Sequence, residues 1–232
     1  MDTNRQDSIV APDVIKAQHP LIIGVGAVGR SVAETLTCNG IPRISLCDFD
    51  VVEEHNKSTQ GFFHSDIGKP KVEAVAEHCL RINPDLIIDI VNDRFRPKHF
   101  EAINSKYPVT GIFSCVDSLA LRFTFFKFFQ KKASEIPIFD ARIGGEMVRI
   151  VSVTDQDSRE YYPNTITSDA EAYSHGCHIP MIKHAATMGA CHIVQQYMAC
   201  ISGKPNYPDR FFNLMGDFQI NKYEDFVNAQ SS

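Results

Sequence analysis

Three glycines, Gly24, Gly26 and Gly29, stand at G-x-G-x-x-G spacing near the start of the chain. They follow an apolar run at 21–23 and precede an amphipathic stretch at 30–39 that is typical of a helix. A buried strand that turns through glycines into a helix directs free backbone N–H groups and the positive end of the helix dipole at one point. The spacing therefore predicts a binding site for a phosphate group.

Two aspartates, Asp48 and Asp50, follow the next apolar run, which we expect to be a second strand. Asp50 lies 21 residues after Gly29. In dinucleotide-binding folds a gap of about 20 residues separates the glycines from the acid that binds a ribose hydroxyl. The glycines alone are a weak signal, but here the strand, the helix and the acid occur together. We interpret this stretch as a nucleotide site.

The loop that follows Asp50 carries a more specific pattern. It resembles the ThiF/MoeB adenylyltransferases, a family that includes the adenylation domains of ubiquitin-activating enzymes. Their signature is D-x-D-x-V-x-x-x-N-x-x-R-Q, followed by a D-x-G-x-x-K segment that opens a helix. The residues at or close to these places are Asp50, Val52, Asn56, Gln60, Asp66, Gly68 and Lys71. Thr59 occupies the position of the signature arginine.

The resemblance implies an enzyme that uses ATP and Mg²⁺ to adenylate a carboxylate, the C-terminal glycine of a ubiquitin-like protein. It implies that Arg5 reaches the phosphates of a partner subunit, that Lys71 binds phosphate, and that Asp117 holds Mg²⁺. It also implies that Cys177 accepts the acyl group as a thioester. The residues expected to bind ATP are Gly24, Gly26, Ala27, Gly29, Asp48, Asp50, Asn56, Gln60, Lys71, Asp117 and Arg122.

The placement of Asp117 does not depend on the resemblance. It follows the apolar run 108–116, which predicts a fourth strand, and ligands bind beyond the carboxyl ends of parallel strands. Two of these residues have plain structural alternatives. Asp117 could cap the helix that starts at Ser118, and Lys71 could be a solvated surface lysine. The alternative for Arg5 is a solvated charge near a frayed terminus.

Cys177 lies on a glycine-preceded turn before a predicted helix, between His175 and His178. A helix N-terminus and a nearby imidazolium would lower the pKa of its thiol and favour a nucleophile. The alternative is a small buried hydrophobic residue. A metal site of these residues with His184 fits no common zinc spacing. The chain has no C-x-x-C pair, so we expect no structural zinc.

Composition excludes several classes of protein. The chain has 232 residues, 44% of them hydrophobic, and a formal charge of −5, with no basic run longer than Lys131-Lys132. It contains no run of 18 apolar residues and no signal-peptide pattern in its polar N-terminus. Seven scattered cysteines favour a reducing compartment. We therefore expect a cytoplasmic protein that binds neither nucleic acid nor membrane.

The order of predicted elements favours an α/β fold. Strands and helices alternate, which predicts a Rossmann-like, doubly wound, mostly parallel sheet, finishing with antiparallel strands after a hairpin turn at 142–145. We expect one adenylation domain over 1–232, with a nucleotide-binding half at about 20–141 and a C-terminal half at about 142–232. Residues 155–171 are polar and predict a long exposed crossing loop, and 179–201 predicts a long helix. Closely spaced phenylalanines at 123–129 favour core packing, and the family's dimers suggest contact with a second subunit.

Thr59 leaves alternatives for the function. A guanidinium is a planar donor that threonine cannot replace, so Arg5, Lys57 or Arg122 compensates or catalysis is impaired. An impaired chain could serve as one half of a heterodimer and lend Arg5 to an active partner. A further alternative is adenylation of a small molecule, a peptide or a tRNA base. A plain dehydrogenase ranks last, because nothing in the chain suggests a hydride-transfer partner.

Overall fold

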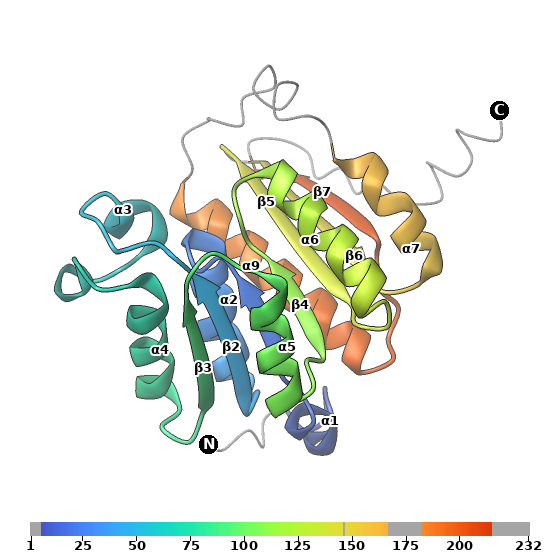
Figure 1. Ribbon diagram of the computed structural model, residues 1–232, viewed down its shortest axis with the longest axis horizontal. Coiled ribbons are helices and arrows are strands. Elements are labelled where there is room, and N and C mark those ends of the chain that lie inside the picture. The colour runs from blue at the N-terminus through green and yellow to red at the C-terminus, as the bar shows by residue number, and fades with distance from the viewer. Residues whose placement is uncertain (1–5, 146, 167–181, 215–232) are drawn as a thin grey trace.

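The computed structural model describes residues 6–145, 147–166 and 182–214 (Figure 1). The strands are β1 (Pro20–Ile23), β2 (Arg43–Asp48), β3 (Ile87–Asn92), β4 (Gly111–Ser114), β5 (Ile138–Gly144), β6 (Met147–Val153) and β7 (Asp209–Asn213). The helices are α1 (Pro12–Lys16), α2 (Ala27–Cys38), α3 (Asn56–Gln60), α4 (Lys71–Ile82), α5 (Pro97–Lys106), α6 (Leu119–Lys132), α7 (Gln156–Tyr161) and α9 (Lys183–Ile201), with 3-10 turns η1 (His64–Asp66) and η2 (Tyr162–Thr165). Within the described ranges no helix has the length and apolar character needed to cross a bilayer.

The strands form one seven-stranded sheet in the order β3-β2-β1-β4-β5-β6-β7. The first five pair in parallel, and β6 and β7 join antiparallel. The prediction of a doubly wound, mostly parallel sheet with an antiparallel finish is confirmed. Because β1 to β5 run the same way, their carboxyl ends lie along one edge of the sheet, where such folds bind ligands.

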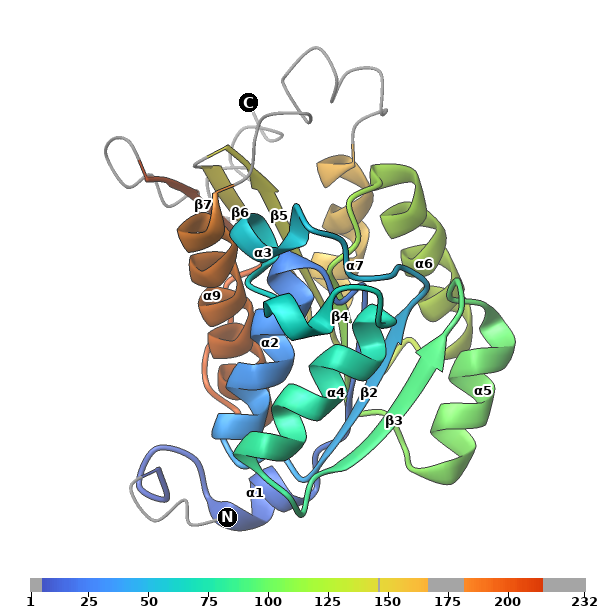
Figure 2. The ribbon, with the colours of Figure 1, turned by 90° about the vertical axis from the view of Figure 1, so that its left-hand side faces the viewer.

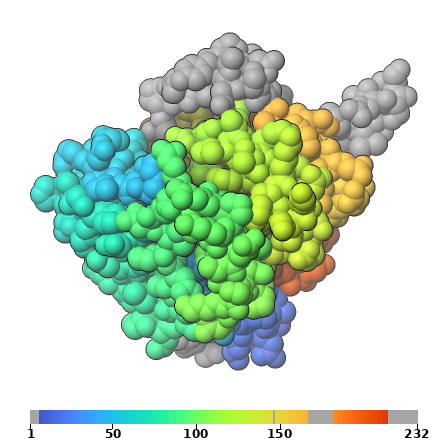
Figure 3. Space-filling model, in the orientation of Figure 1, coloured from blue at the N-terminus to red at the C-terminus, as the bar shows by residue number. Residues whose placement is uncertain are grey.

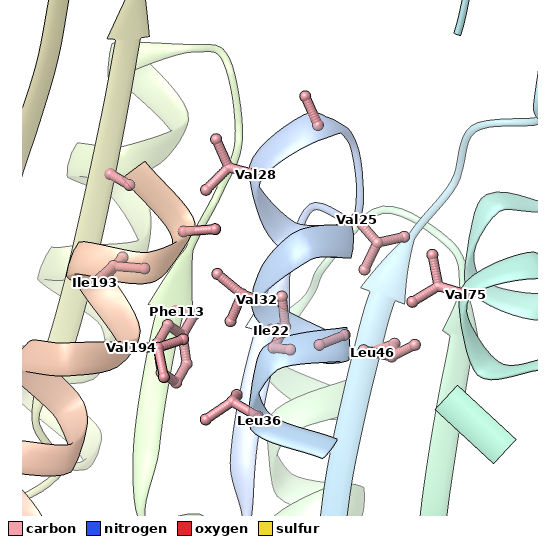
Figure 4. Packing of buried hydrophobic residues seen from close by; sticks show 14 of the residues in the cluster. Ile22, Val25, Val28, Val32, Leu36, Leu46, Val75, Phe113, Ile193 and Val194 are labelled. Carbon is pink, nitrogen blue, oxygen red and sulfur yellow. The ribbon is translucent and has the colours of Figure 1, made fainter. Parts of the chain in front are cut away.

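Helices cover both faces of the sheet (Figures 1 and 2). Alternate side chains of β1 serve the two cores: Ile22 packs with α2, α4 and α9, while Leu21 and Ile23 pack with α5 and α6. Figure 4 shows α2 side chains such as Val32 beside Val194 of α9. In Figure 3, α5 and α6 form much of the face toward the viewer. These two apolar layers fix the sheet edge that carries the site.

The structure differs from the sequence predictions of local structure in two places. Of the exposed loop expected over 155–171, residues 156–165 instead form α7 and η2, because Asp155 caps α7 by accepting the backbone N–H of Ser158, and 167–171 lie outside the described residues. Tyr162 is buried and its hydroxyl donates to Asp140 of β5. The hairpin turn predicted at 142–145 starts only after Gly144, because β5 continues to that residue and Arg142 pairs with Arg149 in the sheet.

Other differences are shifts of boundaries. The helix expected from residue 30 begins at Ala27, directly after the glycine loop. The helix expected over 179–201 is observed from Lys183, while 179–181 lie outside the described residues. In the tail, Asp209–Asn213 forms the edge strand β7, and 215–232 lie outside the described residues.

The phenylalanines of α6 are core residues, as the composition favoured. Phe125, Phe126 and Phe129 are buried, and they pack with aromatic rings that include Phe95 and Phe100. The ring centroids of Phe95 and Phe125 are 5.2 Å apart in an edge-to-face arrangement, which aromatic pairs prefer. Contact of this helix with a second subunit stays a prediction.

A candidate nucleotide site at the carboxyl edge of the sheet

A cavity of about 570 Å³ opens at the carboxyl ends of the parallel strands. This volume lies within the range of about 300–1,000 Å³ that is usual for small-molecule sites. Its lining brings together most of the residues predicted to bind ATP: Gly24, Gly26, Ala27, Asp48, Asp50, Asn56, Gln60, Lys71, Asp117 and Arg122. Gly29 does not line the cavity and lies buried in α2.

The glycine loop needs two of its glycines for steric reasons. Gly24 has a φ of +87°, and a Cβ there would lie 2.7 Å from the carbonyl oxygen of Cys115. A Cβ on Gly29 would lie 1.8 Å from the carbonyl oxygen of Gly24. The loop can therefore pass this close to α2 and to β4 only where these side chains are missing.

The N-terminus of α2 faces the cavity. Gly26 is the N-cap and supplies no side-chain cap, and Gly26, Ala27 and Val28 line the cavity. The first N–H groups of a helix have no partner within the helix, and the helix dipole adds positive potential at this end. This end of α2 is therefore suited to bind a phosphate group.

Asp48 was predicted to bind the nucleotide, and its carboxylate bonds to the backbone of the site. Its Oδ2 accepts the N–H of Val25 at 2.7 Å, and its Oδ1 accepts the N–H of Asp50 at 2.9 Å. Hydrogen bonds to an ionised acceptor are about twice as strong as neutral ones. Asp48 thus joins the glycine loop after β1 to the segment that follows β2.

Lys71 and Asp50 form an ion pair within the cavity wall. The Lys71 Nζ lies 2.8 Å from Asp50 Oδ2, with the lysine side chain 7% exposed and the aspartate 46%. The alternative of a solvated surface lysine is wrong. The backbone closes the loop at the same place, because Lys71 N–H donates to Asp50 O and Val51 pairs with Pro70 in an isolated bridge. The half-exposed carboxylate remains open to the cavity.

The short helix α3 brings Asn56 and Gln60 to the cavity, beside the N-terminal end of α2 (Figure 2). Asn56 is buried, and its Oδ1 accepts the N–H of Glu53 at 2.8 Å. The Oε1 of Gln60 is buried and has no hydrogen-bond partner among the described residues. A buried acceptor without a partner is unfavourable by about 1–3 kcal/mol, so a ligand donor at this place would relieve that cost.

Asp117 is exposed at the cavity rim after β4. It does not cap α6, because Ser118 is the N-cap and its Oγ accepts the N–H of Leu121. No hydrogen bond or ion pair to its carboxylate occurs within the described part of the chain. Among the residues that the structure describes, no three or more His, Cys, Asp or Glu side chains are grouped so that they could hold a metal ion. One free carboxylate beside a phosphate site fits Mg²⁺, which is usually bound by one or two carboxylates, water and substrate phosphates.

Arg122 lines the cavity but is engaged by the protein. Its side chain is 5% exposed and pairs with Asp140, which is fully buried. It also donates to the carbonyl oxygens of Ser114 and Val116. Arg142 bonds to the same aspartate through Nε and Nη2 at 2.9 and 2.7 Å. Burial, and then the charge of Arg142, lower the pKa of Arg122 to about 10, so it stays protonated at neutral pH.

Two cysteines form part of the cavity floor. Burial is the main cause that raises the pKa of Cys47 to about 12, with Asp48 adding to it, and burial also raises the pKa of Cys115 to about 12. Both therefore remain neutral thiols at neutral pH and are unsuited to nucleophilic chemistry.

Arg5 and Cys177 lie outside the described residues. Of the residues that could replace the signature arginine, Lys57 forms an ion pair with Glu54, and Arg122 pairs with Asp140 as described above. Thr59 itself is on α3, where its hydroxyl donates to the carbonyl of His55 at 3.4 Å. The part of the chain that the structure describes therefore offers neither Lys57 nor Arg122 as an unpaired cation.

Phe49 and Arg94 are among the cavity residues that sequence reasoning did not assign to the site. Arg94 follows β3 by two residues, so the rule that placed Asp117 at the end of β4 could have placed it as well. Phe49 lies between the two aspartates of the signature, and no role was assigned to it from the sequence.

The sheet order, the glycine loop and the acid after β2 define an α/β domain of the Rossmann type. The sequence pattern of the ThiF family matches residues 10–228. The chain belongs to the ThiF family.

Individual relatives match over part of their length. The chain is similar to the molybdopterin-synthase adenylyltransferase of Escherichia coli (strain K12), with 31% identity over 112 residues, 47% of this chain and 44% of the relative. It is also similar to ubiquitin-like modifier-activating enzyme 5 of Rattus norvegicus, with 38% identity over 112 residues, 44% of this chain and 28% of the relative. The match thus spans less than half the length of these curated relatives.

Two solved structures share the fold. Escherichia coli MccB, crystallised with MccA, superposes with a TM-score of 0.70 at 16% identity, covering 90% of this chain and 64% of MccB. PaaA superposes with a TM-score of 0.71 at 18% identity, covering 95% of this chain and 68% of PaaA. At this identity the likeness extends to the fold alone.

Proposed function

We propose that the protein is an ATP-dependent adenylyltransferase that activates a carboxylate, the C-terminal glycine of a ubiquitin-like protein. The observation that carries the proposal is one cavity lined by the N-terminus of α2, Asp50, Lys71 and Asp117. These groups offer a phosphate site, a ribose acceptor, a cation and a free carboxylate. Family membership and the names of the relatives, an adenylyltransferase and a modifier-activating enzyme, support it.

In the proposed reaction a carboxylate oxygen of the acceptor attacks the α-phosphorus of ATP. The bond from the α-phosphorus to the bridging oxygen breaks, and pyrophosphate leaves with the electron pair. The protein contributes positioning and charge stabilisation. The N–H groups at Gly26 and Ala27 bind phosphate, Asp50 accepts from the ribose, and Asn56 and Lys71 bind the phosphates.

Mg²⁺, held by Asp117 with phosphate oxygens and water, would neutralise charge on the triphosphate. Lys71 is already held at the cavity wall by Asp50, so its ammonium need not be ordered when the nucleotide binds. Contribution of Arg5 from a second subunit and transfer of the acyl group to Cys177 remain predictions, since neither residue is among those described.

The test is pyrophosphate exchange into ATP with Mg²⁺ and a ubiquitin-like protein from the same organism that ends in glycine. We expect pyrophosphate exchange only when the ubiquitin-like protein is present, and loss of exchange in the Asp117→Ala variant. An Asp117→Ala variant with wild-type exchange would contradict the assigned role. Exchange with a short peptide or a small carboxylic acid, and with no ubiquitin-like protein, would assign a different acceptor.

Thr59 favours a second candidate, a subunit that has lost catalysis and supports an active partner. Thr59 stands where the family signature has an arginine, and the nearby Lys57 is paired with Glu54. ATP binding by the purified chain separates the two proposals. Micromolar binding with exchange supports the enzyme, whereas weak or no binding supports the catalytically impaired subunit.

A further inference from the structure

Arg94 is a cation of the cavity that the proposed reaction does not use. It follows the carboxyl end of β3 and lines the same cavity as Asp50. Among the described residues its guanidinium has no ion pair with a carboxylate. The neighbouring Asp93 also lines the cavity, but its carboxylate pairs with Arg96 at 3.4 Å and lies 3.6 Å from His99.

The partner of the Arg94 guanidinium is an aromatic ring. Its Cζ lies 4.1 Å from the centroid of Phe49, within the range of a cation–π contact. Phe49 is 47% exposed and stands between Asp48 and Asp50, directly beside the proposed ribose acceptor. A guanidinium on a ring has a second face, which is available to another flat group.

The backbone of Arg94 is fixed on both sides. Asp93 Oδ1 accepts the N–H of Arg94 at 2.7 Å, and the thiol of Cys47 donates to the carbonyl of Asp93 at 3.4 Å. On the other side the ring of Phe95 packs against Phe125. With its backbone fixed and its guanidinium on the Phe49 ring, Arg94 loses less conformational entropy when a ligand binds, which favours a binding role.

The sheet order places Arg94 on the base side of a nucleotide. β3 is two strands away from β1, with β2 between them. Neighbouring strands are about 4.8 Å apart, so the end of β3 lies roughly 10 Å across the sheet from the glycine loop. A nucleotide with its phosphates at Gly26 and its ribose at Asp50 extends its base toward β3, where Arg94 and Phe49 lie.

We propose that the Arg94 guanidinium, backed by the Phe49 ring, is the platform on which the purine base of the nucleotide stacks. Arg94 is then a specificity-determining residue that favours purine over pyrimidine triphosphates, because a purine presents the larger π-face. The platform reads the face of the base and not its edge, so it contributes equally to ATP and GTP. This inference rests on the proposed nucleotide site.

The experiment measures dissociation constants of ATP, GTP and UTP with Mg²⁺ by calorimetry for the full chain and its variants. In Arg94→Ala we expect ATP and GTP to bind about tenfold more weakly, as for the loss of one stacked base, and UTP to change less than about threefold. Arg94→Lys keeps the positive charge but lacks the planar guanidinium, so its dissociation constants should resemble those of Arg94→Ala. Phe49→Leu removes the ring beneath the guanidinium and should weaken purine binding in the same direction.

Arg96→Ala is the matched control, because Arg96 is an exposed arginine two residues away that does not line the cavity. Its dissociation constants should equal those of the wild type. If Arg94→Ala weakens the binding of ATP, UTP and inorganic tripolyphosphate equally, and Arg94→Lys binds all three as the wild type does, Arg94 contacts a phosphate and the stacking proposal is overturned. Unchanged ATP binding in Arg94→Ala would also overturn it.

The failure of this inference differs from the failure of the proposed function. If the wild-type chain binds ATP and pyrimidine and purine nucleotides respond alike to Arg94→Ala, the platform fails and the nucleotide site stands. If the wild-type chain binds none of the nucleotides, the proposed site fails and the platform fails with it.

Discussion

Two arginines line the cavity from opposite ends of the parallel sheet, and their surroundings differ. Arg122, at the β4–β5 end, is buried against Asp140 and two backbone carbonyls. Arg94, at the β3 end, is exposed and rests on an aromatic ring. Sequence reasoning chose Arg122 for the nucleotide and overlooked Arg94. Presence in a cavity wall does not identify a ligand-binding cation. The number of its donors already used by the protein is the better guide.

The largest expected effect comes from Asp140→Ala, which leaves Arg122 and Arg142 buried without their shared carboxylate. Removing one partner of a buried ion pair is unfavourable by about 3–5 kcal/mol. We expect a loss of this size in the free energy of unfolding, measured with urea. The control is Asp89→Ala, whose ion pair with Lys106 is on the surface and should contribute less than about 1 kcal/mol. Equal losses in both variants would contradict the structural role of Arg122.

Lys71 and Lys69 offer a matched pair of lysines two residues apart. Lys71 is buried beside Asp50 in the cavity, whereas Lys69 pairs with Glu77 on the surface. Lys71→Met removes a cation from the proposed triphosphate site, and we expect kcat/KM for pyrophosphate exchange to fall about 10²-fold. Lys69→Met should leave kcat/KM unchanged. If both variants keep full exchange, Lys71 belongs with Arg122 among the cations that only support the fold.

Gly29 and Gly144 test how tightly the glycine loop is packed. A Cβ on Gly29 would lie 1.8 Å from Gly24 O, whereas a Cβ on Gly144 has no atom within 4 Å. Overpacking of this kind is unfavourable by about 1–3 kcal/mol. Urea unfolding of Gly29→Ala should show this loss together with weaker ATP binding, and Gly144→Ala should show neither. An unchanged Gly29→Ala protein would mean that the loop can move away from α2.

The smallest effect concerns thiol reactivity. Cys38 and Cys191 are exposed, while Cys47 and Cys115 lie in the cavity floor. Burial raises the pKa of Cys47 and of Cys115 to about 12, so almost none of these two thiols is ionised at pH 8. The thiolate is the form that reacts with an alkylating reagent. Among the cysteines that the structure describes, we expect alkylation at pH 8 to modify Cys38 and Cys191 before Cys47 and Cys115, as followed by peptide mass spectrometry. Rapid modification of Cys115 would show that the β4 end of the cavity is more open than the structure has it.

The sheet and the phosphate end of the cavity were predictable from the sequence, because they depend on local patterns. Gly24, Gly29 and Asp50 stand at fixed spacings within one strand–helix–strand unit. The role of Asp48 was less accessible, since its carboxylate accepts the backbone N–H of Val25, a residue 23 positions away whose side chain takes no part in the bond.

Long-range partners account for most of what was missed. Asp140 pairs with Arg122 and Tyr162, and none of the three is adjacent in the sequence. The polar stretch after residue 155 therefore predicted a loop although Tyr162 anchors it to β5. Likewise the stack of Arg94 on Phe49 joins the ends of two strands that only the sheet brings together.

The closure of the segment between Asp50 and Lys71 has a consequence for how such chains can diverge. Its two ends meet through the Lys71–Asp50 ion pair, the bond from Lys71 N–H to Asp50 O and the bridge between Val51 and Pro70. A segment fastened at its base can change its inner residues without altering the strands on which it stands. Thr59 lies on α3 inside this closed segment, where its hydroxyl donates to the carbonyl of His55, so the side chain at this position can differ while the two ends of the segment stay joined.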